Sequence, residues 1–186
     1  MANPHTKTEI VEALRVVQTG LSQDVHHMTP EQFDRAEEGW TAAGYLKHLL
    51  LSIKPLVRVY EMPPENILRM FRRPEHTPRS YADLCAAYNM RLAEGIRAED
   101  YDKVVPEAYR MPDDVTDARV YLAQSWNEAH ERLFAALDGW TDADLDAHQV
   151  PHPALKVVTL REMLFFTLHH NTLHWRDMQR VGLRIT

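Results

Sequence analysis

The sequence is poor in cysteine, with Cys85 as the one such residue among 186. A single cysteine cannot form a disulfide within the chain, and it excludes zinc sites that are built from several cysteine thiolates. Any metal bound here therefore needs imidazole or carboxylate ligands. Cys85 lies in an apolar helical segment, which favours a buried small side chain over a nucleophile. A reducing compartment is the simplest expectation.

Long apolar runs and an excess of basic residues are also absent. No stretch approaches about 18 consecutive apolar residues, and the first residues lack the apolar core of a signal peptide. We therefore expect a cytoplasmic protein that does not enter a membrane. The chain has 21 Lys and Arg against 27 Asp and Glu, a net charge of −6. This balance, without a basic run, argues against nucleic acid or an anionic membrane as a partner.

Glycine is scarce too, with six residues, and segments that alternate apolar and polar residues are few. Apolar residues instead recur at helical spacing almost throughout, which predicts an all-α protein. Long helices are expected over about 7–28, 41–60, 115–137 and 159–181. Pro55 lies inside the second of these, where we expect a kink rather than a break.

The four long helices predict a four-helix bundle with an irregular, partly helical insertion between the second and third. The insertion, over about 64–114, is punctuated by proline and has one helical stretch at about 81–99. Two similar acidic segments, 29–34 and 141–146, follow the first and third helices and suggest paired hairpins. Such segments also recur in unrelated helical proteins. No shift in composition marks a second domain, so we expect one domain over residues 1–186.

Histidine is what the sequence has in abundance, with 11 residues. His170 and His174 are four apart in the last helix, so their Cβ atoms are about 5–6 Å apart on one face. Chance supplies roughly 0.6 such pairs in a chain of this composition, so the spacing alone is a weak signal. The same face carries Met163, Phe166 and Asp177, which directs it into the bundle. Buried histidines need partners, either a metal or neighbouring side chains.

His48 in the second long helix is a candidate third ligand. Its face also carries small residues, Thr41, Gly44 and Ser52, which leave room beside the imidazole for a pocket. Glycine equally permits close packing against another helix, so both interpretations stand. Three histidines from two helices leave a metal position open for water or substrate, as in catalytic rather than structural sites.

Two segments carry a resemblance to a known family. GWTAAGYLKHL (39–49) and HPALKVVTLREMLFFTLHHNTLH (152–174) resemble the second-helix and last-helix signatures of the DinB/YfiT-like superfamily. The order of elements is similar across nearly the whole chain. The resemblance implies a four-helix bundle of that type, with a divalent metal, Zn or Ni, bound by His48, His170 and His174.

Asp177 departs from the family pattern, because many relatives carry Gln three residues after the last ligand. Its place on the helix suits a hydrogen bond to a ligating imidazole. A surface salt bridge with Arg176 or Arg180 is the alternative. The segment 61–114 is also longer than in the smallest relatives, and we expect it to cover the mouth of the bundle.

The remaining histidines are expected mostly on the surface, at a helix flank or in loops. They include His130 in the third long helix, and the pair His148 and His152, where Pro151 and Pro153 interrupt a helix. Trp40 and Trp126 are expected to pack in the core rather than line a pocket. The residues identify no general base.

The resemblance implies a metal-dependent enzyme, because relatives use low-molecular-weight thiols for transfer or isomerisation, or are proposed hydrolases. We expect a small-molecule substrate, with water or a thiol at the open metal position. The alternative is a non-catalytic metal- or ligand-binding protein of a stress response. The resemblance is also compatible with a homodimer.

Overall fold

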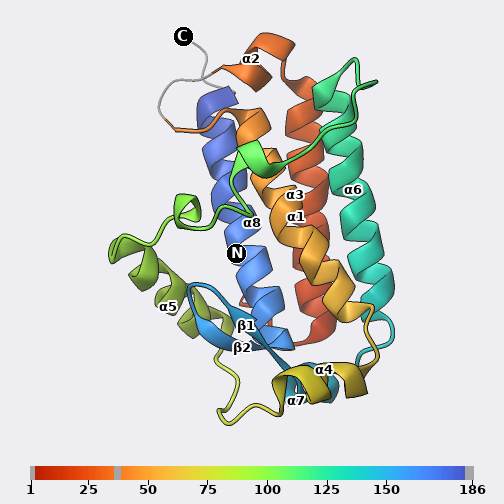
Figure 1. Ribbon diagram of the computed structural model, residues 1–186, viewed down its shortest axis with the longest axis vertical. Coiled ribbons are helices and arrows are strands. Elements are labelled where there is room, and N and C mark those ends of the chain that lie inside the picture. The colour runs from red at the N-terminus through yellow and green to blue at the C-terminus, as the bar shows by residue number, and fades with distance from the viewer. Residues whose placement is uncertain (1–2, 36–38, 183–186) are drawn as a thin grey trace.

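Four long helices dominate the computed structural model, which describes residues 3–35 and 39–182 (Figure 1). They confirm the predicted four-helix bundle. Their bounds are α1 (Lys7–His27), α3 (Ala42–Tyr60), α6 (Ala118–Leu137) and α8 (Leu160–Gly182). Each agrees with its prediction to within a few residues, and α3 continues as a helix through Pro55.

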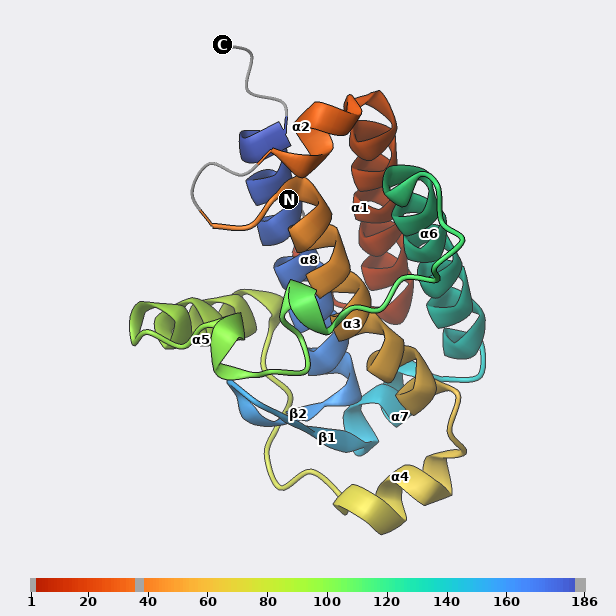
Figure 2. The same ribbon diagram turned by 45° about the horizontal axis from the view of Figure 1, so that its top comes forward.

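The order of the helices around the bundle is not the order along the chain. Helix α1 packs against α6 and α8, and α3 packs against the same two, so α1 and α3 lie diagonally opposite. The short α2 (Pro30–Asp34) crosses one end of the bundle between them (Figure 2). Consecutive long helices α1 and α3 therefore do not form the hairpin that the repeated acidic segments suggested.

Threonine side chains define where the helices at the site begin. Thr41 Oγ1 accepts a hydrogen bond from the Gly44 amide at 3.0 Å and caps α3. Thr159 caps α8 in the same way, accepting from the Glu162 amide at 3.2 Å. The Glu162 carboxylate in turn accepts a hydrogen bond from the Thr159 amide at 2.8 Å. These caps satisfy amide groups that a helix leaves without partners, and they set the rotation of both helices.

The insertion between α3 and α6 is partly helical, as predicted. It contains α4 (Pro64–Phe71), α5 (Tyr81–Ala93) and two short 3-10 helices, η1 (Ala98–Asp100) and η2 (Pro106–Ala108). Helix α5 packs on α8, and η2 packs on α3. The helix expected to reach residue 99 ends at Ala93 because Gly95 takes a φ of +97°, outside the helical range.

The segment between α6 and α8 differs from the expected turn and loop. It forms α7 (Asp142–Ala147) and a hairpin of β1 (Gln149–His152) and β2 (Lys156–Thr159). The strands are antiparallel, with Val150 paired to Val158. β-Branched residues in 156–159 favour an extended backbone, and the hairpin closes the lower end of the bundle in Figure 1.

The core lies between the four long helices. The apolar stripe of α1 is fully buried there and consists of Ile10, Leu14, Val17 and Leu21. His130 of α6 is buried as well, which corrects the expected surface position. Helix α6 packs against both α1 and α3. These two helices together cover more of its surface than a single face. Within the described residues, no helix is long and apolar enough to cross a membrane.

Candidate metal centre

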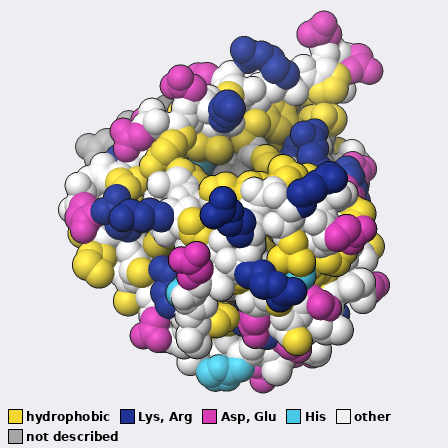
Figure 3. All heavy atoms as spheres, turned by 60° about the horizontal axis from the view of Figure 1, so that its bottom comes forward, with side chains coloured by type: hydrophobic (Ala, Val, Ile, Leu, Met, Phe, Trp, Pro, Cys, Tyr) yellow, Lys and Arg dark blue, Asp and Glu magenta, His cyan; other side chains and the backbone are white. Residues whose placement is uncertain are grey.

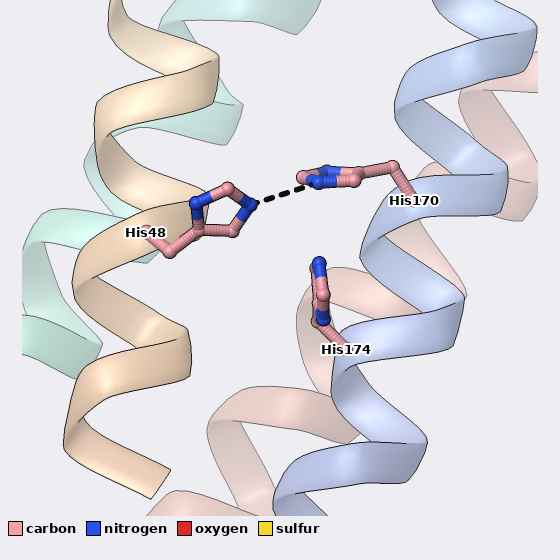
Figure 4. Close-up of side chains that lie close together, drawn as sticks. All are labelled: His48, His170 and His174. Atoms are coloured by element: carbon pink, nitrogen blue, oxygen red, sulfur yellow. Dashed lines mark hydrogen bonds between the residues drawn. The ribbon is translucent and has the colours of Figure 1, made fainter. Parts of the chain in front are cut away.

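Three histidines from two antiparallel helices face one another inside the bundle (Figure 4). His48 comes from α3, and His170 and His174 come from successive turns of α8. The Nε2 atoms of His48 and His170 are 2.9 Å apart. One ring nitrogen of each residue lies within 4.8 Å of the others. In the part of the chain that the structure describes, this is the one group of three or more such residues.

Hydrogen bonds on the outer side of two rings determine which nitrogen faces the centre. His48 Nδ1 lies 2.7 Å from the Val104 carbonyl oxygen, which can only accept, so Nδ1 carries the proton. His174 Nδ1 lies 3.2 Å from Asp177 Oδ2 and donates to that carboxylate. Nε2 is therefore the nitrogen that each of these two rings can present to a metal, and His48 Nε2 also lies within hydrogen-bond distance of His170 Nε2.

Burial favours the neutral form of His48 and His170. Desolvation, together with the neighbouring His174, lowers the pKa of His48 to about 4. Desolvation also places the pKa of His170 well below its usual value, and the adjacent His174 and His48 add to the effect. Protons therefore do not compete for these lone pairs at neutral pH.

The donor set and its spacing fit a divalent metal. Imidazole nitrogens bind zinc at about 2.0–2.1 Å, which puts neighbouring nitrogens of a tetrahedral site about 3.3 Å apart. The observed separations, from 2.9 Å to within 4.8 Å, bracket that value. Three neutral ligands leave the ion its full charge and at least one open position.

The three histidines lie on the wall of a cavity of about 730 Å³. Its lining is mostly apolar and comes from α3, α8, the hairpin and the insertion. Figure 3 shows hydrophobic side chains around a hollow in the surface. This volume lies within the range of sites that hold drug-sized ligands, so the cavity has room for more than water.

Comparison with known proteins identifies the family. The sequence pattern of the DinB superfamily matches residues 13–178. The chain belongs to the DinB superfamily. No functionally curated protein matches it.

A solved structure with the same fold is YfiT from Bacillus subtilis. That protein is described as a probable metal-dependent hydrolase with an unusual four-helix bundle topology. It shares 22% sequence identity with this DinB-superfamily chain, at a TM-score of 0.60. The similarity covers 97% of this chain and 91% of YfiT.

Asp177 makes both of the contacts considered for it in this DinB-superfamily bundle. One carboxylate oxygen accepts from His174, and the other accepts from Arg180 at 3.0 Å. The insertion contributes to the cavity wall, as expected, with side chains that include Tyr88, Leu92 and Tyr101.

The structure distinguishes the two interpretations left open for Gly44, and it corrects the expectation for Trp40. A Cβ on Gly44 would lie 3.0 Å from Trp40 Cβ and 3.6 Å from Pro106, so this glycine permits close packing and makes no pocket. Trp40 lines the cavity instead of packing wholly in the core. Its ring centroid is 4.9 Å from that of His48.

Sequence reasoning missed Val104 and His152. The Val104 carbonyl orients His48 from the insertion, 56 residues away along the chain. His152, expected in an exposed loop, is a buried residue of β1 that lines the cavity. The signal available for His152 was its position at the start of the segment that resembles the family.

Proposed function

We propose that this chain is a metal-dependent hydrolase of small apolar substrates. In this proposal His48, His170 and His174 bind a divalent metal at the wall of the cavity. The observation that carries it is the convergence of three imidazoles, with ligand nitrogens within 4.8 Å of one another, beside a mostly apolar cavity of about 730 Å³. The description of YfiT as a probable metal-dependent hydrolase supports the reaction class.

The chain's own residues orient the histidine rings, bind the substrate and exclude water from the site. Val104 and Asp177 hold the rings of His48 and His174 with their lone pairs toward the centre. The apolar walls bind the substrate body and reduce the local dielectric constant, which strengthens electrostatic effects on the reacting group. When zinc is bound by three such ligands, it lowers the pKa of a bound water to about 7 or polarises a carbonyl.

A thiol-dependent transferase is the second candidate. Arg97 and Arg176 line the cavity, and both are exposed cations. Cations of this kind suit the carboxylates of a low-molecular-weight thiol, whose sulfur would occupy the open metal position. The transferase would use these two charges to bind the thiol, whereas a hydrolase of purely apolar substrates would not need them.

Metal analysis of untagged protein tests the ligand set. The wild type is expected to hold one Zn or Ni per chain after reconstitution. His48→Ala and His170→Ala are expected to lose it. His169→Ala is the matched control, because the His169 ring hydrogen-bonds Asn89 instead. A wild type without stoichiometric metal, or a His170→Ala variant that retains it, would refute the proposed centre.

An activity assay distinguishes the candidate functions. Nitrophenyl esters of increasing acyl length are offered to the Zn- and Ni-loaded protein, with and without a small thiol. A hydrolase gives turnover that a chelator abolishes, that rises with acyl length and that needs no thiol. Turnover that requires the thiol supports the transferase. Stoichiometric metal without turnover of any ester or electrophile supports a non-catalytic binding protein.

A further inference from the structure

His152 has one ring nitrogen committed to the backbone. Its Nδ1 lies 3.2 Å from the Ala154 amide nitrogen and 3.1 Å from the Leu155 amide nitrogen. Backbone amides only donate, so Nδ1 is an unprotonated acceptor, and the neutral ring carries its proton on Nε2. Desolvation, with the nearby charge of Arg79, lowers the pKa of His152 to about 4. The ring is thus a neutral Nε2–H donor near pH 7.

The Nε2–H group has no partner within the described residues. His152 is 6% exposed, and its two hydrogen bonds, from the Ala154 and Leu155 amides, both go to Nδ1. The fully enclosed unpartnered side-chain atoms in the described chain are Arg119 Nε and His148 Nε2, so His152 Nε2 is not sealed off. Because His152 lines the cavity, this donor is available to a molecule inside it.

Phe166 connects His152 to the candidate metal centre. The Phe166 ring stacks on His170 at 5.0 Å between centroids and meets His152 edge to face at 4.2 Å. His152 is therefore separated from the three-histidine group by one aromatic ring. A ligand that reaches from one to the other passes along Phe166.

The surroundings of His152 are apolar. Val150, Pro151, Pro153 and Met163 line the same cavity. Arg79, the cation whose charge acts on His152, is already paired with the buried Glu162 carboxylate at 2.6 Å. Arg91, which donates to the Ala154 carbonyl at 3.1 Å, is paired with Glu94. A carboxylate placed here would lose its hydration without gaining a free counter-charge, whereas an uncharged oxygen needs only one donor.

We propose that His152 is a positioning residue whose Nε2–H binds an uncharged oxygen, such as a carbonyl, on an apolar substrate held at the three-histidine centre. This inference rests on the proposed function, since it places the reactive end of the substrate at the metal. One donor in an apolar wall selects for a matching acceptor, because a ligand without it leaves the donor desolvated and unpaired.

Two substitutions separate this role from a role in the turn. His152→Asn places its side-chain oxygen where Nδ1 lies, so it can still accept from the turn amides, but it has no atom at the Nε2 position. His152→Gln places an N–H group near the Nε2 position and loses the Nδ1 acceptor. If His152 only supports the turn, it needs the acceptor at the Nδ1 position, which Asn keeps. If it positions a ligand, it needs the donor at the Nε2 position, which Gln keeps.

The probes are octanohydroxamic acid, whose hydroxamate chelates metal, and analogues of equal length with one ketone at successive distal carbons. Their affinities are measured by calorimetry on the full-length Zn-loaded wild type and variants, with folding checked by circular dichroism. The wild type and His152→Gln are expected to favour one ketone position by about three- to tenfold over the others. His152→Asn is expected to bind all analogues within about twofold, with an unchanged zinc content.

A wild type without preference among ketone positions overturns the inference, as does a His152→Asn variant that keeps the wild-type preference. Failure of every hydroxamate to bind the Zn-loaded protein instead refutes the proposed metal centre, and the inference falls with it. Ring ¹⁵N NMR of the wild type gives a measurement without substitution. The His152 Nε2–H signal must move with the favoured ketone and not with octanohydroxamic acid.

Discussion

At the scale of single residues, His48 and His174 are oriented by partners of different kinds. A backbone carbonyl of the insertion holds His48, and a carboxylate three residues along the same helix holds His174. The carbonyl is neutral, whereas the carboxylate is a charged acceptor, which makes the hydrogen bond to His174 stronger. The Asp177 contact is therefore the one that a side-chain substitution can test.

Asp177→Asn is expected to weaken metal binding by about tenfold to a hundredfold, because the amide removes the charge that polarises His174. Competition with a chromophoric chelator measures the affinity. Arg180→Gln serves as the control, since it removes the other partner of Asp177 and leaves the His174 contact. Equal affinities of Asp177→Asn and the wild type would show that the carboxylate plays no part.

His130 makes stability depend on pH. Desolvation lowers the pKa of this buried ring to about 4. The unfolded chain, with a histidine pKa of about 6.5, then binds more protons between about pH 6.5 and 4, so stability falls as the pH falls through this window. The expected slope is at most about 1.4 kcal/mol per pH unit from this residue.

Urea unfolding at several pH values checks the His130 effect. His130→Gln is expected to flatten the dependence between about pH 6.5 and 4, because it removes the titrating ring. The variant and the wild type are first compared at pH 7.5, which separates the loss of packing from the loss of titration. An unchanged slope in the variant would assign the pH dependence to other groups.

At the scale of elements, α1 and α8 approach closely where Gly20 meets Trp175. A Cβ on Gly20 would lie 2.3 Å from the Trp175 ring, too near for any real contact. The indole cannot turn aside freely, because its Nε1 donates to Asp24 Oδ2 at 2.7 Å. The glycine thus sets the separation of two helices, one of which carries His170 and His174.

Gly20→Ala is expected to destabilise the protein by about 1–3 kcal/mol, because the added methyl forces Trp175 or the whole helix to move. At a helix position with no neighbouring side chain, the same change would stabilise the protein by up to about 1 kcal/mol. The sign of the change in unfolding free energy therefore distinguishes the two cases. Thr19→Ala, at the exposed neighbouring position of α1, is the matched control. Chemical denaturation compares the three proteins, and a stabilised Gly20→Ala variant would contradict the close approach.

At the scale of the whole molecule, the candidate centre joins α3 to α8. These helices come from opposite ends of the chain and are linked through the insertion, α6, α7 and the hairpin. A ligand that binds the folded chain alone stabilises it in proportion to the logarithm of its concentration. A metal held by His48 and His170 would therefore stabilise the bundle as a unit.

Zinc at a hundredfold excess over its dissociation constant is expected to add about 2.7 kcal/mol of stability. For a chain of this length that corresponds to a rise in Tm of about 5–10 °C, which a chelator should reverse. Differential scanning calorimetry of the apo and loaded forms measures it. His48→Ala is expected to show no such shift, and an equal shift in that variant would place the stabilising metal elsewhere.

Local patterns were sufficient for the long helices, whereas the grouping of His48 with His170 and His174 came from the family resemblance. Helical spacing is a property of neighbouring residues, and it predicted the helices around His48 and His170 to within a few positions. The short elements α7 and β1–β2 escaped prediction, because four to six residues carry little periodicity. The capping box of Thr141 with Asp144 was the signal available for α7.

Composition and periodicity by themselves determined that this protein is helical, that any metal must be held by imidazole or carboxylate, and which helix faces could present it. Only the tertiary structure decided that α1 and α3 lie diagonally, that His130 is buried, and that Val104 and His152 belong beside the site. The physical reason is that these contacts join segments far apart in the chain, whose pairing depends on how whole helices pack rather than on any local pattern.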